Sequence, residues 1–507
     1  MIIPSARRAL AWAVALAAGL GGAIVAFHYH RAGLTLSHYD ARGHLVVARR
    51  ILDSITPGWQ QIGAVWLPLP HLLNAIPVRV DLFYRTGASG VAISVAAFAI
   101  ATGSIAAIVL ALTESSSAAI AGAAVFALNP NVLYLQSTPM SEPLLLALTT
   151  LAVAMLMAEC NQRRHAIRDP PSAFRNATGG LFALACLTRY EAWPVTVAAL
   201  AAAGFASWRR GESVLAAAWA VGRIALYPAL GVVGFAIFSR IVVGEWFVSG
   251  GFFVPENKAL GDPIMAAKEI GWGVRMSSGP MLTAIGGVGT ALLVAIALVS
   301  RRRATAMIPA SLVAMAALPW TAFVDGHPFR LRYMVPLMAM EAVGAGVLAG
   351  AMPPARVAGA IVLATVAAYE LRPLDASAPM VTEAQWDRPN TPVRARVTAC
   401  LGAPGSGDKI MASMGSLGHY MQESSRAGFA IRDFLHEGNG DIWLAALEGP
   451  YPFAEWIFIE EKAEGGDMLA QIARARPAFL DGYVRVCEGA GLALYKRAEG
   501  RGQRAKG

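Results

Sequence analysis

The sequence predicts a polytopic α-helical membrane protein that ends in an extracytoplasmic α/β domain. Of its 507 residues, 56% are hydrophobic and only 15% are charged, whereas a soluble domain carries about 25% charged residues. The mean hydropathy of +0.50 agrees with lipid as the solvent. These values exclude a soluble enzyme, a coiled coil and a disordered chain. The four cysteines are too few for a disulfide framework.

About eleven apolar segments are expected to cross the bilayer, because a helical span needs about 20 predominantly apolar residues. Several of the segments are short, which makes the number approximate. In chain order they are 10–27, 89–112, 118–128, 142–157, 179–187, 193–206, 224–238, 281–299, 307–323, 333–350 and 357–368.

The positions of the arginines test this assignment of transmembrane segments and explain most of the net charge of +9. With the N-terminus in the cytoplasm, five of the inner loops carry arginine, as the positive-inside rule requires. A nucleic-acid partner is therefore not needed to explain the basic excess. An odd number of spans places the residues after Arg372 outside. The arginines include Arg7, Arg8, Arg163, Arg164, Arg209, Arg210, Arg301, Arg302, Arg303 and Arg356.

The region 371–507 differs from the membrane domain, 1–370, because polar and apolar residues are mixed in short runs. Strands are expected at 409–413, 442–447, 456–460, 483–487 and 492–496, and helices at 392–401, 416–423 and 467–475. This pattern predicts a small external α/β domain. Cys400 and Cys487 both lie in this oxidising compartment, and the sequence leaves open whether they pair.

The first external loop, 28–88, carries a candidate acid near its start. Asp40 follows His38 and Tyr39 and precedes a helix-like stretch, 41–52. We expect this stretch to lie in the membrane interface, with its arginines facing lipid phosphates. Asp40 is then either a reactive carboxylate or the N-cap of that helix. The arginines of the stretch are Arg42, Arg49 and Arg50.

Charged residues also occur in three later external turns, although charge is rare near the lipid. Glu142 begins a span, so it is either functional or an acid favoured by the helix dipole. Arg189 and Glu191 form either a functional site or a surface ion pair. Arg330 and Arg332 are either functional or part of an ordinary charged loop. External arginines run against the positive-inside bias, which favours an anionic ligand.

The residue types suggest a chemistry. A carboxylate can deprotonate a hydroxyl as it attacks, and arginines can hold a phosphate and stabilise its developing charge. Acids and arginines at the external edges of the spans therefore point to a substrate with a leaving phosphate near the membrane surface. A lipid-linked sugar phosphate has this chemistry.

Four stretches resemble the GT-C superfamily of integral-membrane glycosyltransferases. The resemblance is strongest to the family 39 type, which includes protein O-mannosyltransferases and lipid A aminoarabinose transferases. An external C-terminal α/β domain is also familiar from bacterial members. The stretches are 38–52, with an acid before interface helices; 134–143, with a Ser-Glu element; 188–193, with Arg-Tyr-Glu-aromatic; and 329–336, with Arg-Tyr-x-x-Pro.

The resemblance implies roles for these residues. Asp40 would be the general base, and the donor phosphate would bind to three arginines. Two further acids would contact substrate hydroxyls or orient the arginines. Because Ala41 rather than a second acid follows Asp40, a divalent metal is not indicated and no cofactor is expected. The phosphate-binding residues are Arg189, Arg330 and Arg332, the further acids are Glu142 and Glu191, and additional candidates are His38, Tyr39, Lys258 and His327.

The resemblance thus implies an inverting glycosyltransferase that moves a hexosyl or pentosyl group from a polyprenyl-phosphate-linked donor to an envelope acceptor. The acceptor is a lipid, a glycan or a protein, and no motif encodes it or the sugar. The resemblance implies a multi-pass protein of a bacterial-type inner (plasma) membrane. Membrane lipids are therefore expected as partners. One alternative is a transporter or flippase of lipid-linked glycan intermediates, which should show inverted repeats and midplane charges. Another is a structural assembly subunit.

Overall fold

The computed structural model describes residues 5–163, 172–242, 244, 246, 257–404, 408–462 and 466–498. The chain forms two compact units. The first, here called the membrane unit, comprises Met1–Ala32, Ala64–Leu69 and Val91–Glu383. The second, here called the α/β unit, comprises Gly33–Gly63, Pro70–Gly90 and Ala384–Gly507. The first external loop, which the sequence assigned to the membrane domain, is therefore divided between the two units.

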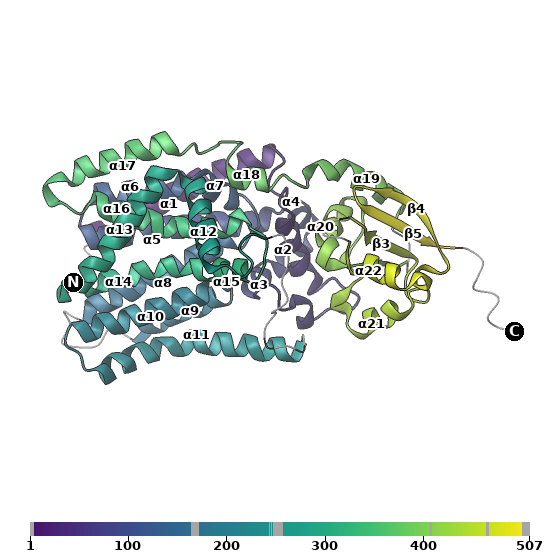
Figure 1. Ribbon diagram of the computed structural model, residues 1–507, viewed down its shortest axis with the longest axis horizontal. Helices are drawn as coiled ribbons and strands as arrows, with labels where there is room; N and C mark the ends of the chain where they lie inside the picture. Colours follow the sequence, from purple (N-terminus) through teal and green to yellow (C-terminus); the bar gives the residue numbers. More distant parts are fainter. Residues whose placement is uncertain are drawn as a thin grey trace. The chain divides into compact units, whose positions relative to one another are not determined.

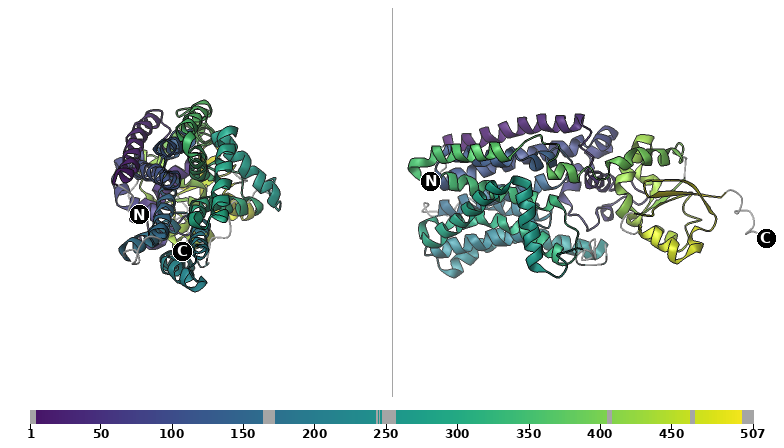
Figure 2. Two further views of the ribbon diagram at one scale, coloured as in Figure 1. Left: turned by 90° about the vertical axis from the view of Figure 1, so that its left-hand side faces the viewer. Right: turned by 45° about the horizontal axis from the view of Figure 1, so that its top comes forward.

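The membrane unit is built from helices, many of which run alongside one another (Figures 1 and 2). The eleven apolar segments expected from the sequence are helical, because a helix satisfies its backbone groups internally in lipid; 307–323 and 333–350 each combine α-helix with 3-10 turns. The helices are α1 (Ser5–Arg31), α5 (Ala88–Thr113), α6 (Ser116–Ala127), α7 (Pro130–Leu135), α8 (Glu142–Arg163), α9 (Ser172–Cys186), α10 (Ala192–Arg209), α11 (Val214–Val242), α12 (Pro263–Ser278), α13 (Pro280–Val299), α14 (Met307–Ala310), α15 (Ala317–Val324), α16 (Met338–Ala349), α17 (Arg356–Glu370) and α18 (Pro379–Glu383).

Among the described residues, seven helical stretches are long and apolar enough to cross a membrane. The expected number of eleven spans therefore stays a prediction. The seven stretches are Ala9–Arg31, Ala88–Thr113, Glu142–Gln162, Val214–Val242, Pro280–Val299, Arg301–Val324 and Leu331–Ala349.

Glycines allow α16 to lie very close to its neighbours. A Cβ added to Gly289 of α13 would lie 1.9 Å from the carbonyl oxygen of Gly344 in α16. On another side, a Cβ on Gly346 of α16 would lie 3.1 Å from the Cα of Gly122 in α6. Small residues of this kind let helix backbones approach in a lipid environment, where van der Waals packing drives association.

The α/β unit contains a five-stranded mixed sheet of order β2-β1-β3-β5-β4; Figure 1 labels β3, β5 and β4. Strand β1 is parallel to β2 and β3, whereas β5 is antiparallel to β3 and β4. The β4–β5 hairpin turns at Ala490 and Gly491, whose φ angles of 52° and 83° suit a type I′ turn. The strands are β1 (Ile410–Ala412), β2 (Phe434–Leu435), β3 (Trp456–Glu460), β4 (Tyr483–Gly489) and β5 (Leu492–Arg497).

Helices cover both faces of this sheet. Side chains alternate along β3, so that Phe458 belongs to one buried cluster and Ile457 to the other. The cluster with Phe458 includes Leu45 of α2 (Tyr39–Arg50) and Tyr420 of α20 (Met414–Ser424). The other cluster includes residues of α21 (Asp441–Glu448) and α22 (Met468–Ala475). A helix from the first external loop is thus one layer of the α/β unit. The remaining helices are α3 (Leu69–Ala75), α4 (Asp81–Thr86) and α19 (Thr391–Ala399).

The predicted strand at 442–447 is wrong, because these residues form α21. Trp443 and Ala446 are three residues apart and lie on its buried face, which is helical spacing. Leucine and alanine favour a helix, and Asp441 in the first turn suits the helix dipole. The other four predicted strands are confirmed as β1, β3, β4 and β5, whereas the two-residue β2 was not predicted.

The apolar face of 41–52, which was expected to lie in the membrane interface, packs instead inside the α/β unit. Leu45, Val46 and Ala48 of α2 are buried against the sheet. Its arginines are occupied within the α/β unit: Arg49 pairs with Asp53 and Asp81, while Arg42 pairs with Glu423 and Arg50 donates to the carbonyl of Gln61. They are therefore not available to lipid phosphates.

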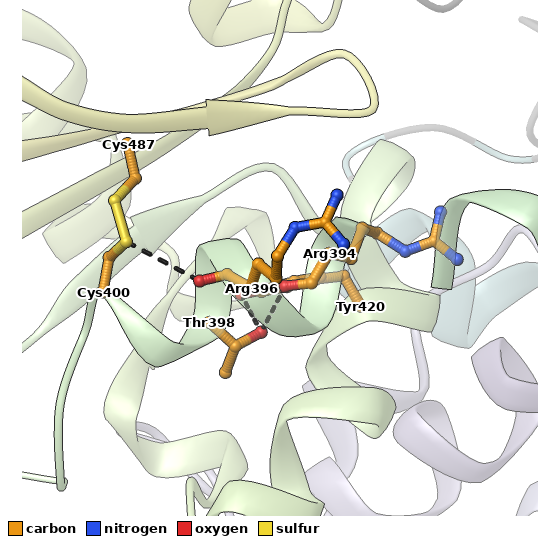
Figure 3. Close-up of a disulfide and its surroundings, with 6 residues drawn as sticks. All are labelled: Arg394, Arg396, Thr398, Cys400, Tyr420 and Cys487. Atoms are coloured by element: carbon orange, nitrogen blue, oxygen red, sulfur yellow. Dashed lines mark hydrogen bonds between the residues drawn. A yellow bond between two sulfur atoms is a disulfide. The ribbon is translucent and has the colours of Figure 1, made fainter. Parts of the chain in front are cut away.

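Cys400 and Cys487 form a disulfide, which settles the question left open by the sequence (Figure 3). Cys400 is the C-cap of α19 and Cys487 lies in β4, so the bridge joins this helix to the sheet. Next to it, the Thr398 hydroxyl lies 2.7 Å from the Tyr420 hydroxyl, which connects α19 to α20 (Figure 3).

Candidate active site

Asp40 is a buried carboxylate in the first turn of α2. The N-cap of this helix is His38, whose Nδ1 accepts a hydrogen bond from the Asp40 amide at 3.1 Å. The alternative interpretation of Asp40 as the N-cap is therefore wrong. Asp40 is only 2% exposed and lies in the first turn of the helix. The residue type and position suit a general base.

Aromatic rings surround the residue that precedes Asp40. The Tyr39 ring meets His419 edge-on at a centroid distance of 5.7 Å and Trp386 at 6.5 Å. The ring of His38 is stacked on Tyr39 at 6.1 Å. Three of the residues predicted from the sequence, at positions 38–40, thus lie together in the α/β unit.

The membrane unit brings Glu142, Arg189 and Glu191 into direct contact. Nη1 of Arg189 lies 3.0 Å from Oε1 of Glu142, the first residue of α8, and also donates to the Ser141 hydroxyl at 3.0 Å. Nη2 and Nε of Arg189 donate to Oε1 of Glu191 at 2.6 and 3.1 Å. The side chains of Arg189, Glu142 and Glu191 are 10%, 0% and 1% exposed. This is not the surface ion pair that was the alternative interpretation.

Two carboxylates therefore share one guanidinium. Burial by itself lowers the pKa of Arg189, but the charges of Glu142 and Glu191 outweigh burial and hold that pKa above its usual value. Arg189 is firmly ionised, and its charge is already balanced within the protein.

Tyr333 links the late external turn to this cluster. It is close enough to Arg189 to contribute to the raised pKa of that arginine. The guanidinium of Arg332 lies 5.0 Å from the Tyr333 ring centroid, and its Nη2 donates to the Tyr333 hydroxyl at 3.3 Å. His327 Nε2 lies 3.4 Å from the same hydroxyl. Arg332 and His327 are thus gathered around one tyrosine near Arg189.

Arg330 differs from Arg189 in its electrostatic surroundings. It is half-buried, and no described residue forms a hydrogen bond or an ion pair with its guanidinium. Burial lowers the pKa of His327, and the charge of Arg330 lowers it further, so the imidazole is neutral at pH 7. A half-buried arginine without a carboxylate partner can bind an incoming anion.

Lys258 lies at the margin of this region. Its neighbour Asn257 donates a hydrogen bond from Nδ2 to the carbonyl oxygen of His327, which places the loop beside the late turn. Lys258 itself is exposed. Burial raises the pKa of Glu269, and the charge of Lys258 partly offsets this effect. The structure therefore pairs Lys258 electrostatically with Glu269.

Sequence reasoning missed two contributors to the site. Tyr333 was part of the Arg-Tyr-x-x-Pro element, and its position next to Arg332 was the available signal. Glu383, at the end of α18, accepts a hydrogen bond from the Leu331 amide at 2.7 Å and so holds the start of the late span. Nothing local in the sequence links it to a residue 52 positions earlier. Within the described residues, no three His, Cys, Asp or Glu side chains are grouped to hold a metal ion.

Comparisons with known proteins identify the fold of this chain. No model of a known protein family matches the sequence, and no curated protein matches it. ArnT from Cupriavidus metallidurans bound to undecaprenyl phosphate matches at 12% identity and a TM-score of 0.55, over 94% of this chain and 97% of that chain. Its apo state matches at 11% identity and 0.53, with the same coverage. The apo oligosaccharyltransferase of Archaeoglobus fulgidus matches at 12% identity and 0.52, over 88% of this chain and 70% of that chain.

At 11–12% identity, these likenesses define the fold. They agree with the four motif stretches of the sequence and with the apolar helices of the membrane unit. The chain is a multi-pass membrane protein with the GT-C fold.

Proposed function

We propose that this protein is an inverting glycosyltransferase. It moves a sugar from a polyprenyl-phosphate-linked donor to an envelope acceptor on the external face of a bacterial-type inner membrane. The observation that carries the proposal is the likeness in fold, over nearly the whole chain, to ArnT bound to undecaprenyl phosphate. The multi-pass membrane unit and the external charges expected from the sequence support the same assignment.

In this proposal Asp40 is the general base. Its carboxylate takes the proton from an acceptor hydroxyl, and the oxygen attacks the anomeric carbon of the sugar. The bond from that carbon to the phosphate oxygen breaks, and the polyprenyl phosphate leaves with the electron pair. The burial of Asp40 and its place in the first turn of α2 support this role.

The arginines of the membrane unit have the complementary task of binding the phosphate. Arg330 is the best candidate, because no described carboxylate neutralises it. The guanidinium of Arg332 is held over the Tyr333 ring, beside the same turn. Arg189 is balanced by Glu142 and Glu191, which favours these acids as groups that orient Arg189 over acids that contact substrate hydroxyls. A charged hydrogen bond to phosphate is worth about 1.5–3 kcal/mol.

The test is sugar transfer by the purified protein. The wild type and Asp40→Asn are reconstituted in lipid nanodiscs with a panel of polyprenyl-phosphate sugars and an envelope extract that supplies the acceptor, and the release of polyprenyl phosphate is measured. We expect the asparagine variant to fold as the wild type does and to lose at least about 100-fold in rate, since general-base catalysis typically contributes 10²–10⁴-fold.

A matched control is Asp441→Asn, which changes an exposed acid in the first turn of α21. It should retain the wild-type rate. Near-wild-type turnover by Asp40→Asn would remove Asp40 from the mechanism. Movement of the lipid-linked donor across vesicles without its consumption would instead favour the flippase.

A further inference from the structure

We propose that the C-terminal part of the chain positions Asp40, by holding α2 through a buried ionic chain formed by Arg42, Glu423, Arg394 and Asp387. The inference rests on the proposed role of Asp40 as the general base. It assigns to the α/β unit a task in catalysis, carried by residues that do not themselves touch the substrate.

The chain begins two residues after Asp40. Arg42 is buried, and its Nε donates to the Leu36 carbonyl at 2.6 Å. Its Nη1 forms an ion pair with Oε1 of Glu423. The two side chains are 6% and 16% exposed. A helix of the first external loop is thus tied to a residue 381 positions later.

The chain continues through Arg394 of α19. Its Nε donates to Oε2 of Glu423 at 2.9 Å, while Nη1 and Nη2 donate to the two carboxylate oxygens of Asp387 at 2.8 and 2.7 Å. The Arg394 and Asp387 side chains are 4% and 5% exposed. Thr391 and Asn390 add hydrogen bonds to the two acids. Two arginines and two acids balance one another, which a buried network requires.

Independent contacts hold the two ends of α2. At its start, Tyr39 packs edge-on against His419 and Trp386. At its end, Arg50 donates to the carbonyl of Gln61, and Nε2 of Gln61 donates to the carbonyl of Gly438 at 2.7 Å. Gly438 follows β2, so this contact joins the loop to the carboxyl end of a parallel strand.

These contacts matter because α2 cannot hold its own position. A helix of 12 residues is marginal in water without tertiary packing, and Gly43 in its interior weakens it further. A general base must lie within about 3 Å of the oxygen whose proton it removes. A misplacement of about 1 Å can reduce the rate by about 100-fold. Loosening α2 should therefore reduce turnover more than substrate binding.

The test uses Glu423→Gln in the full-length protein, with kinetics and hydrogen exchange measured on the same samples. We expect kcat to fall by about 100-fold and KM for the polyprenyl-phosphate sugar to stay within about twofold, because the proposed phosphate ligands are unchanged. Amides of 39–50 should exchange faster than in the wild type. Amides of β3 and β5 should remain protected, which shows that the unit is still folded.

Two further variants make the result specific. Arg42→Lys keeps the charge but cannot make both the Leu36 and the Glu423 contacts, so its kcat should fall less than that of Glu423→Gln. It also serves as the test if Glu423→Gln does not fold. Arg476→Gln breaks an exposed ion pair of the same unit, in which Arg476 and Glu448 are 45% and 81% exposed, and should leave both measurements unchanged.

Unchanged exchange of 39–50 in both Glu423→Gln and Arg42→Lys would overturn the proposal, as would a raised KM with an unchanged kcat. A wild type that transfers no sugar would instead refute the proposed function. Hydrogen exchange of the α2 amides can be measured without turnover, so this measurement would still decide whether the ionic chain holds the helix. The two failures are therefore distinguishable.

Discussion

Arg189 and Arg330 have opposite electrostatic surroundings, although both are arginines in turns between helices of the membrane unit. Arg189 compensates two buried carboxylates, and removing a partner from a buried ion pair leaves an uncompensated charge. Arg330 compensates no described carboxylate. The first side chain therefore has a task in the protein itself, and the second is free for a ligand.

Replacing each arginine by methionine should separate these tasks. Arg189→Met should lower the free energy of unfolding by about 3–5 kcal/mol, because Glu142 and Glu191 lose their counter-charge. Arg330→Met should be as stable as the wild type. Its KM for the polyprenyl-phosphate sugar should be about 10- to 100-fold higher, which corresponds to the loss of one charged hydrogen bond. Thermal unfolding in detergent and steady-state kinetics measure the two effects. An unstable Arg330→Met with a normal Arg189→Met would contradict the assignment.

At the scale of helices, α16 lies close to its neighbours because glycines at the points of contact carry no side chain. Gly289 and Gly344 let α13 and α16 approach until a Cβ would overlap a backbone carbonyl. The overlap involves backbone atoms, which cannot rotate away as the end of a flexible side chain can. Glycine at position 289 is therefore required by packing, although its place in a helix interior costs about 1 kcal/mol relative to alanine.

Gly289→Ala should destabilise the membrane unit by about 1–3 kcal/mol, the usual range for overpacking. The control is Gly287→Ala on the same helix, where a Cβ would meet nothing within 4 Å. That variant should be neutral or slightly stabilising, because alanine is the better helix former. Thermal unfolding in one detergent compares them. Equal melting temperatures would show that α13 and α16 do not pack through these glycines.

At the scale of the whole molecule, stability should depend on pH through buried histidines of the α/β unit. His436 is fully buried, and its Nδ1 accepts a hydrogen bond from the Gly438 amide at 3.1 Å. Burial, and next the charge of Arg50, lowers the pKa of His436 to about 3. Burial similarly lowers the pKa of His419 to about 4. Burial raises the pKa of Asp467 to about 6, which opposes these two effects.

The sign for His436 follows from proton binding. Below its ordinary pKa of about 6.5 the unfolded chain binds a proton at this residue and the folded chain does not, so stability falls as the pH falls. Between pH 7 and pH 5 the loss should be about 2 kcal/mol. His436→Asn keeps an acceptor for the Gly438 amide and removes the titration. Chemical unfolding followed at both pH values should show a smaller acid loss in this variant; an equal loss would reject His436 as its source.

Much of the architecture was accessible from the sequence, because its causes are local. Apolar runs such as 89–112 and 281–299 must be helical in lipid, where each backbone group needs an internal partner. The hairpin strands at 483–487 and 492–496 follow from residue type and spacing. The charged residues of the four external turns could also be identified, since charge is rare near lipid.

The tertiary structure decided what depends on partners distant in the chain. The segment 442–447 is helical because Trp443 and Ala446 find a buried face, whereas a short apolar run by itself is ambiguous. Two arginines of α2 pair with Glu423 and Asp81, which lie far from them in the chain. Arg189 is balanced because two acids from different turns reach it. The sequence determined which residues carry charge and where helices form, but only folding decided which charges are compensated, because compensation requires groups that meet in space.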